Sequence, residues 1–438
     1  MDQTEALIIE TIDRHREEIL EFAGDIYSHA ELGYKEFQTS GKFVKKMEQL
    51  GLRTEKGFAI TGVKAYLNED KKENASLALL GELDALRIPE HAFANPETNA
   101  AHCCGHHAQM AGVFGAALAL TVPEIAEKLD GQVVFFATPA EEYGEIEFKN
   151  QLREQGKIRY GGGKCELLRI GAFDDIDLCL THHIRPGNEI LVGSGTGNGF
   201  VSKVIRVLGK ASHAAGAPEK GVNALSAASL GLQALGLNRE TFRDEDCVRV
   251  HPIITKGGNL VNVIPDEVVV ETLVRGKTIE AFTDAAKKTD RSFKAGAIAM
   301  GAKVEISTLP GYLPTLAEEA LPELKHAAEI SASGIPVIEA SGHAGGSTDV
   351  GDVQHLMPVY TFNTGGVKGG LHQIDFEVTD EEEAYIVTAK MFALAAYGLL
   401  KEKAQRSREL VDQYEPVFKN SAEYVEFMEQ FDSKEIFE

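Results

Sequence analysis

The spacing of apolar residues predicts alternating helices and buried strands in the first half of the chain. Apolar positions recur at helical spacing from residue 7 to residue 22 and predict one long helix. Further helices are expected at residues 42–50 and 108–120. Short apolar runs predict buried strands at residues 77–80, 133–137 and 178–180. This alternation is typical of an α/β domain built on a largely buried sheet.

The pattern changes after a glycine-rich segment, Gly195–Gly199, where we expect a hinge. Strands are predicted at residues 201–207, 248–254, 261–273 and 303–307, and helices at residues 223–237 and 278–300. The order strand, helix, strand, strand, helix, strand is typical of a ferredoxin-like sandwich. The α/β pattern then returns, with a strand at 358–362 and a helix at 381–402. We therefore predict an α/β domain, residues 1–196 and 310–438, interrupted by an inserted domain, residues 197–309.

Composition narrows the set of partners and compartments. The 438 residues include 67 acidic and 44 basic side chains, a formal charge of -23, which repels phosphate backbones and anionic lipids. We therefore expect neither nucleic acid nor a membrane as partner, and no apolar run approaches membrane-spanning length. The acidic start of the chain does not resemble a signal peptide. Five cysteines, an odd number, argue against a disulfide framework and for a reducing, cytoplasmic location.

Side chains that bind metals follow the predicted strands of the α/β domain. These are Asp84, the Glu141–Glu142 pair, the His182–His183 pair and His372. Open α/β sheets place their sites beyond the carboxyl ends of the strands, so we expect these side chains to lie close together. A further segment, His102-Cys103-Cys104-Gly105-His106-His107, opens the helix predicted at 108–120. Thiolate, imidazole and carboxylate groups are the ligands that divalent transition metals select.

Two adjacent carboxylates suit a metal-dependent hydrolase. One can bind the metal while its neighbour acts as general base toward water. Each motif also has a structural interpretation. A Glu-Glu pair is often a solvated loop, Cys104 and His106 could fill a core, and Cys103–Cys104 could form a vicinal disulfide. One histidine of the 182–183 pair is expected to be structural, and His102 and His107 could orient ligands or merely neighbour them.

The motifs together resemble those of the aminoacylase and glutamate-carboxypeptidase family of dinuclear metallohydrolases. The similarity is to the branch that holds hippurate, indole-acetyl-amino-acid and aminobenzoyl-glutamate hydrolases, and it runs through most of the chain. The matching segments are His29-Ala-Glu-Leu-Gly33, Gly81-Glu-Leu-Asp-Ala-Leu86, Cys104-Gly-His106, Pro139-Ala-Glu-Glu142, His183-Ile-Arg-Pro186, His213 with Gly221-Val-Asn-Ala-Leu225, Asn262-Val-Ile-Pro-Asp266, Ser347-Thr-Asp-Val-Gly351 and Leu371-His372.

The resemblance implies a mixed-sheet α/β catalytic domain with an inserted ferredoxin-like α+β domain that serves as lid and dimerisation domain. It implies two divalent metal ions, manganese or zinc with cobalt as a further option. Glu141 would be the general base and Asp84 would steady a ligand. The implied metal ligands are Cys104, His106, Glu142, His183 and His372.

Residues of the inserted domain receive substrate-directed roles from the same resemblance. In a homodimer, His213 would stabilise the oxyanion in the partner's active site, although its spacing alone fits a surface histidine equally well. Asn262 and Arg275 would hold the substrate carboxylate, for which an arginine fork is well suited. Ser347, in a segment similar to the aminobenzoyl-glutamate branch, would also contact substrate.

The implied reaction is cleavage of the amide bond of an N-acyl or N-aroyl amino acid by metal-activated water. A dipeptidase or carboxypeptidase acting on small peptides is the alternative on the same scaffold. A non-catalytic relative is a third hypothesis, because His107 stands where the branch has aspartate or asparagine, and Cys103 where alanine is common.

Overall fold

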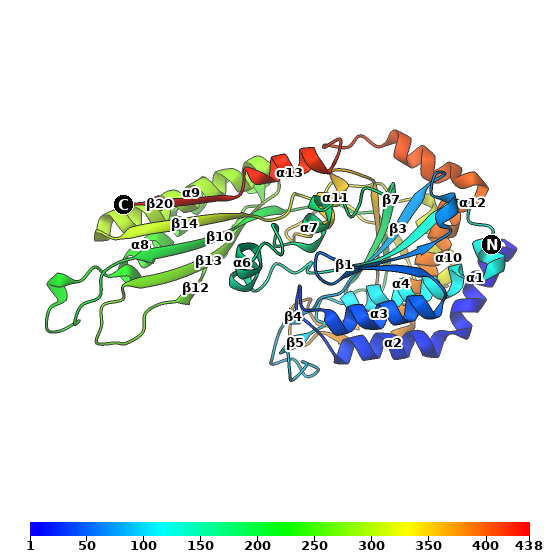
Figure 1. Cartoon of the computed structure of the whole chain (residues 1–438), viewed down its shortest axis with the longest axis horizontal. Coiled ribbons are helices and arrows are strands. Elements are labelled where there is room, and N and C mark those ends of the chain that lie inside the picture. The colour runs from blue at the N-terminus through cyan, green and yellow to red at the C-terminus, as the bar shows by residue number, and fades with distance from the viewer. The chain divides into compact units, whose positions relative to one another are not determined.

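The computed structural model describes residues 1–438 as two compact units (Figure 1). Unit 1 comprises Met1–Gly195, Leu316–Gly342 and Val353–Ser421. Unit 2 comprises Thr196–Thr315, His343–Asp352 and Ala422–Glu438. The division differs from the predicted one. Thr196 and the segments 310–315, 343–352 and 422–438, which the sequence assigned to the α/β domain, belong to unit 2.

Unit 1 is built on an eight-stranded mixed sheet in the order β1-β2-β6-β3-β7-β17-β8-β15. Its four central strands are parallel, since β3 pairs in parallel with β6 and β7, and β17 with β7. Their carboxyl ends therefore lie at one edge of the sheet. The strands are β1 Arg53–Phe58, β2 Gly62–Leu67, β3 Ser76–Glu82, β6 Gln132–Thr138, β7 Leu178–Ile184, β8 Ile190–Val192, β15 Val337–Glu339 and β17 Val359–Thr364.

Helices α1, α2, α3, α5 and α12 of unit 1 pack against a buried helix, α4. Every residue of α4 is buried, as expected for a helix that is apolar on all sides. Its glycines allow close packing on α12, because a Cβ at Gly112 would lie 2.5 Å from a Thr388 methyl group. The helices are α1 Gln3–Arg14, α2 Arg16–Ser28, α3 Phe37–Gln49, α4 His106–Leu120, α5 Pro123–Ala126, α6 Ile146–Glu154, α7 Gly163–Arg169, α10 Pro322–Ser331 and α12 Thr388–Gln413.

The prediction of one long helix from residue 7 to residue 22 is wrong. The chain forms two helices, α1 and α2, joined at His15, whose φ of -95° and ψ of 13° are not helical. An Asp2–Glu5 capping box fixes the start of α1. The apolar positions on both helices still face the core, which is why the sequence pattern suggested a single element.

One helical stretch, Glu382–Gln413, is long and apolar enough to cross a membrane by composition alone. Its most apolar window is 89% buried inside the protein, as in a core helix. The stretch begins with the π-helical turn η5, Glu382–Val387, and non-helical backbone from Lys401 to Ala404 interrupts it.

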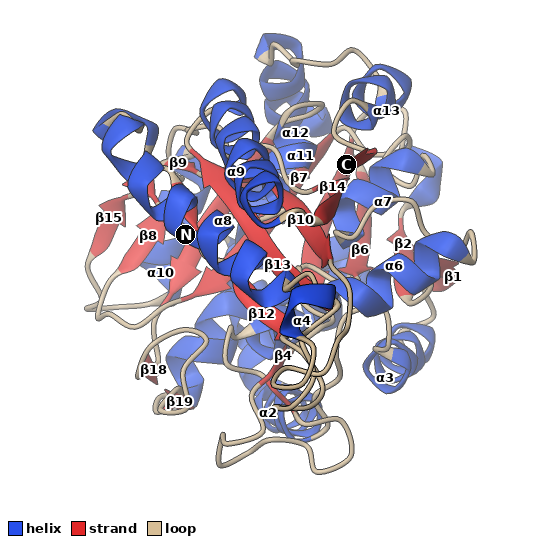
Figure 2. Ribbon diagram, turned by 90° about the vertical axis from the view of Figure 1, so that its left-hand side faces the viewer, coloured by secondary structure: helices blue, strands red, loops and turns tan.

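Unit 2 contains a sheet in the order β11-β13-β10-β14-β20, with β12 also paired to β13. Helices α8 and α9 pack together across one face of this sheet (Figures 1 and 2). Fold class is confirmed: an α/β unit with a mixed sheet and a separate unit with an antiparallel sheet. The elements are β10 Gly199–Leu208, α8 Ala224–Leu237, β11 Arg249–Val250, β12 Ile253–Lys256, β13 Glu267–Gly276, α9 Ile279–Met300, β14 Lys303–Pro310, α13 Ser421–Glu429 and β20 Ser433–Phe437.

Short elements complete the two units. The strand predicted to begin at residue 261 begins at Glu267, because Gly257, Gly258 and Pro265 keep the preceding segment in a loop. The short elements are β4 Leu86–Arg87, β5 Ala100–Ala101, β9 Thr196–Gly197, β16 His343–Ala344, β18 Val367–Lys368, β19 Glu377–Val378, α11 Val350–Gln354, and the 3-10 turns η1 Glu69–Lys71, η2 Pro218–Lys220, η3 Asn238–Thr241 and η4 Asp244–Asp246.

The acidic C-terminal segment completes unit 2. Strand β20 pairs antiparallel with β14 and places Phe437 opposite Val304. In α13, the buried Tyr424 hydroxyl donates a 2.8 Å hydrogen bond to the Asp352 carboxylate. The ring of Phe431 packs 5.5 Å from that of Phe282. These contacts explain why residues 422–438 belong to unit 2.

Candidate metal centre

The loops that follow β3, β6 and β17, the start of α4, and the end of β7 bring the predicted site residues of unit 1 together. Two groups of three side chains have ligand atoms that all lie within 4.8 Å of one another. One group is Cys104, His106 and His183, and the other is Cys104, Glu142 and His372. Both groups share Cys104. The Cys104 thiolate could therefore contribute a ligand to either group.

Distances within the two groups are short. Cys104 Sγ lies 3.2 Å from His183 Nε2 and 3.2 Å from His372 Nε2. His372 Nε2 is also 3.0 Å from Glu142 Oε1. The other ring nitrogen of His183 lies 2.7 Å from the Ile184 carbonyl oxygen, which places the proton on Nδ1 and leaves Nε2 available to a metal ion.

A third group lies beside these two and contains Glu82, His106 and Glu141. His106 Nε2 is 3.1 Å from Glu82 Oε2 and 3.9 Å from Glu141 Oε2. Its Nδ1 is 2.9 Å from the Asp84 carbonyl oxygen and 3.3 Å from Asp84 Oδ1. Asp84 therefore orients the His106 ring, while the two glutamates lie on the side of the ring nitrogen that is free for a metal.

Backbone geometry at Gly105 and His372 shapes the centre. Gly105 immediately precedes α4 with φ +87°, and a Cβ there would lie 2.0 Å from the Ile184 side chain, so only glycine fits. His372 also has a positive φ, 63°, and its amide donates a 2.9 Å hydrogen bond to the Cys103 carbonyl oxygen. A non-glycine residue in this conformation carries strain of the kind found at functional sites.

Buried carboxylates hold the loop that carries Glu141 and Glu142. The amide of Ala140 donates a 2.8 Å hydrogen bond to Glu36 Oε1, and the amide of Glu142 a 2.9 Å bond to Asp84 Oδ2. Thr61 donates a further 2.7 Å bond to the other oxygen of Glu36. Burial, with the nearby Asp84 charge, raises the pKa of Glu36 to about 7.

This raised pKa predicts a pH dependence that Glu36→Gln should remove. The folded protein keeps the Glu36 proton up to about pH 7, whereas the unfolded chain releases it near its ordinary pKa of 4.5. The native state thus binds more protons in this window, and its stability falls by about 1.4 kcal/mol per pH unit as pH rises. Urea unfolding of the metal-free protein at several pH values measures the slope. An identical slope in the variant would contradict the assignment.

Buried neighbouring charges shift the pKa values of the ionisable side chains in the centre. Burial opposes the ionisation of Glu82, but Lys164 and His106 outweigh it and lower the pKa of Glu82 to about 2. Burial also opposes protonation of His106, yet Glu82 and Cys104 raise its pKa well above the ordinary value. Burial, with Glu142 nearby, raises the pKa of the Cys104 thiol. The acidic groups thus attract positive charge, which a divalent ion would supply while lowering the thiol pKa.

The residues present fit divalent metal ions. The buried atoms His106 Nε2 and Glu142 Oε1 lack a hydrogen-bond partner of regular geometry, although both face charged groups. Buried polar atoms without such partners are uncommon, and both are ligand atoms of the predicted type. A donor set of thiolate, imidazole and carboxylate suits manganese, zinc or cobalt and does not choose among them.

The neighbouring histidines and Cys103 lie outside the three groups of candidate ligands. His182 Nε2 is 2.8 Å from the Thr364 hydroxyl and its ring packs on Phe362, as a structural histidine does. His107 Nε2 lies 3.1 Å from the Tyr385 hydroxyl, and the His102 ring packs 5.3 Å from that of His107. Cys103 belongs to the main hydrophobic core, and all five cysteines are free, so the vicinal disulfide does not form.

Four predicted substrate residues lie in unit 2, and their roles stay predictions. His213 is exposed on a loop, and its Nδ1 accepts hydrogen bonds from the amides of Ala215 and Gly216 at 3.2 and 2.9 Å. Asn262 is exposed. The guanidinium of Arg275 lies 5.9 Å from the ring of Phe200, and Ser347 has a buried hydroxyl without a hydrogen bond.

Sequence reasoning missed Glu82 and its partner Lys164. Glu82 accepts from the buried Lys164 ammonium at 2.5 Å and from Gln109 Nε2 at 2.8 Å. The alternation of a strand was the available signal, because Glu82 and Asp84 are two residues apart in the Gly81–Leu86 motif. Lys164 had no signal, since it enters the site from α7, far from any recognised motif.

The fold and this centre define a metal-dependent hydrolase that acts on C–N bonds, and comparison with known proteins gives the family. The model of peptidase family M20/M25/M40 matches residues 78–397, and the chain belongs to this family. The matched range contains every candidate ligand. The predicted resemblance is thereby confirmed.

The relatives of this chain are named for activities on several different substrates. The chain is 27% identical to the Xaa-Arg dipeptidase of Mus musculus over 408 residues, 90% of this chain and 85% of that protein. It is 31% identical to an IAA-amino acid hydrolase, ILR1-like 2, of Arabidopsis thaliana over 59% of this chain and 54% of that protein. One of the p-aminobenzoyl-glutamate hydrolase proteins of Escherichia coli is 27% identical, over 70% of this chain and 60% of that protein.

Solved structures share the fold. A putative aminohydrolase from methicillin-resistant Staphylococcus aureus aligns with a TM-score of 0.69 at 21% identity, over 91% of this chain and all of that one. A dinuclear metal-binding M20 peptidase from Bacillus subtilis aligns with a TM-score of 0.61 at 23% identity, over 89% and 99%.

Proposed function

We propose that the protein hydrolyses the amide bond of N-acyl or N-aroyl amino acids at a centre of two divalent metal ions. The main observation in support of this proposal is that two groups of candidate ligands share Cys104. One position would use His106 and His183, and the other Glu142 and His372. When bound, such ions act as Lewis acids that polarise the amide carbonyl and make water nucleophilic near neutral pH.

Glu141 is placed to move the proton. Its carboxylate is buried, adjacent to Glu142 in the chain, and outside both groups that contain Cys104. As general base it takes a proton from the attacking water and delivers it to the leaving amine. A general base must lie close to the metal centre without binding a metal itself. The distance of 3.9 Å between Glu141 Oε2 and His106 Nε2 supports that role.

In this proposal His213 supplies the oxyanion donor to the metal centre of the partner subunit. Because its Nδ1 accepts two backbone hydrogen bonds, the neutral ring carries its proton on Nε2, which is free to donate. Replacing His213 with glutamine should lower kcat without lowering metal content. If the His213→Gln variant and the unmodified protein have equal kcat, His213 takes no part in the mechanism.

Two kinds of relative support different substrates. The aminobenzoyl-glutamate and IAA-amino acid hydrolases act, by their names, on acylated amino acids, whereas the mouse relative is named as a dipeptidase. The two substrate classes differ in the free amino group of a dipeptide. The dipeptidase activity is therefore the second candidate function.

The test is release of free amino acid from N-acetyl, N-benzoyl and aminobenzoyl amino acids and from matched uncapped dipeptides. Metal-stripped protein is resupplied separately with manganese, zinc and cobalt. We expect metal-dependent cleavage of the capped substrates. Cleavage of uncapped dipeptides alone would favour the dipeptidase, and no cleavage of either class by metal-loaded protein would contradict the proposal.

A homodimer formed through unit 2 is part of the proposal. The edge strand β12 and the loop after it expose large apolar side chains: Ile253, Ile254, Leu260 and Val261. An exposed apolar strand edge is a surface that a second chain can pair with. Light scattering of the purified protein measures the mass, and a monomer at working concentration would contradict this part.

A further inference from the structure

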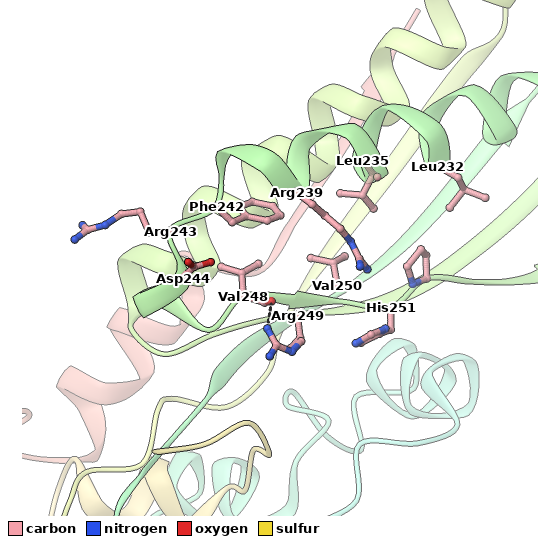
Figure 3. A pocket seen from close by; sticks show the side chains of 12 residues that line it. Leu232, Leu235, Arg239, Phe242, Arg243, Asp244, Val248, Arg249, Val250 and His251 are labelled. Atoms are coloured by element: carbon pink, nitrogen blue, oxygen red, sulfur yellow. Dashed lines mark hydrogen bonds between the residues drawn. The ribbon is translucent and has the colours of Figure 1, made fainter. Parts of the chain in front are cut away.

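A pocket in unit 2 has features of a ligand site that the proposed hydrolysis does not use (Figure 3). It lies between the end of α8 and strand β11 and has a volume of about 570 Å³. Small-molecule sites in proteins usually have volumes of roughly 300–1,000 Å³. The pocket is therefore large enough for a small organic molecule.

The floor of the pocket is apolar. Leu235 and Val250 are buried beneath it, at 5% and 6% exposure, and Leu232, Phe242 and Val248 are partly exposed along it. In Figure 3 these side chains line the space between the helix and the strand. Removal of such surface from water favours a ligand with an apolar body.

The rim of the pocket is basic. It carries Arg239, Arg243 and Arg249 against a single acidic residue, Asp244. Because Glu245 pairs with Arg243, the net positive charge of the rim comes from Arg239 and Arg249 against Asp244, in a chain with a net charge of -23. The rim therefore favours an anion, while the overall charge disfavours a polyanion such as nucleic acid.

Arg239 is the residue best placed to bind the anion. Figure 3 shows its side chain extending from η3, the turn after α8, toward the segment that carries Val250 and His251. Its guanidinium has no hydrogen-bond or ion-pair partner, whereas the Arg243 side chain is paired with Glu245 and the Arg249 side chain donates to the Val248 carbonyl oxygen. A guanidinium beside an apolar floor matches a carboxylate attached to an apolar chain or ring.

We propose that this pocket binds a small amphipathic carboxylic acid, with its apolar body on Leu235 and Val250 and its carboxylate on Arg239. The site lies wholly within unit 2. Its lining shares no residue with the candidate metal centre. The proposal therefore stands whatever substrate the metal centre hydrolyses.

Tryptophan fluorescence can report on this pocket alone, because the chain contains no tryptophan. The Phe242→Trp variant places a single indole in the lining with a conservative aromatic exchange. Leu232→Trp provides a second reporter at the other end of the pocket if the first variant does not fold. Octanoate is the probe, and 1-octanol is its neutral counterpart of matched length.

We expect saturable fluorescence change with octanoate, and none with octanol over the same range. Adding Arg239→Gln should weaken octanoate binding by about tenfold or more, because a charge-assisted hydrogen-bond pair is lost. The matched control is Arg291→Gln, an exposed arginine on α9 that is also unpartnered and does not line the pocket. It should leave the affinity unchanged.

Four results would overturn the proposal. Absence of an octanoate response in both reporters would show that the pocket does not bind the acid. Equal affinity for octanoate and octanol, or an unchanged affinity after Arg239→Gln, would show that the arginine does not recognise a carboxylate. Fluorescence that depends on protein concentration without ligand, together with a matching change in light scattering, would show that a second copy of the chain covers the pocket.

Discussion

Replacing Glu141 with glutamine is expected to lower kcat by roughly 10²- to 10⁴-fold, the usual contribution of a general base, and to leave metal binding intact. The amide keeps the size of the side chain and its place beside His106 but cannot accept the proton. Both groups of ligand atoms that contain Cys104 remain complete, because Glu141 belongs to neither. The measurements are steady-state kinetics and metal analysis of the same preparation.

The neighbouring residue supplies the matched control. Glu142→Gln makes the same chemical change one position along the chain, where Glu142 Oε1 lies 3.0 Å from His372 Nε2. This variant should lose bound metal as well as activity. If Glu141→Gln instead loses metal, its carboxylate is a ligand together with Glu82 and His106, and the base must be sought elsewhere.

Replacing Lys164 with methionine is expected to destabilise unit 1 by about 3–5 kcal/mol, the usual cost of removing one partner from a buried ion pair. Lys164 is fully buried and holds Glu82, which is itself 3% exposed. Methionine fills a similar volume, so the main loss is the charge. The Glu82 carboxylate then keeps only His106 as a close charged partner, and it must either remain buried at a free-energy cost or take up a proton.

Two further variants separate charge from packing in this prediction. Lys64→Met removes another buried lysine, but its partner Asp175 is 45% exposed and can return to water, so the loss should be smaller. The double variant Lys164→Met with Glu82→Gln should recover part of the stability by removing both charges. Urea unfolding of the metal-free proteins measures all three. If the two lysine variants lose the same free energy of unfolding, burial of the Glu82 carboxylate is not the cause of the loss.

The part of the fold that could be predicted from sequence follows from burial. The strands β3 and β6 contain continuous apolar runs because both faces of the parallel sheet are covered, and candidate ligands follow them in the chain. Strand β7 begins with an apolar run, Leu178–Leu180, and carries His183 near its end. His183 and His372 could be placed in one centre only because strand ends of a parallel sheet share an edge. Their common distance from Cys104 could not be predicted, since it depends on loop conformations such as the positive φ at His372.

Other features left no periodic signal. Strand β20 is mostly exposed along its length, so its residues lack the apolar alternation by which strands are recognised. The break at His15 interrupts neither the apolar spacing nor the polar face of the two helices. Lys164 became part of the centre through packing of α7 against the sheet, and its burial is compensated by a carboxylate that is distant in sequence.

The pairing of β20 with β14 has a consequence for the order in which the protein can be assembled. Unit 2 takes its first strands from residues 196–310 and its last from residues 433–437, while the core of unit 1 includes α12, residues 388–413. Neither unit has all of its segments until nearly the whole chain has left the ribosome. Until β20 has been synthesised, the outer edge of β14 is unpaired. A strand of another chain can pair with this edge, and such pairing leads to aggregation.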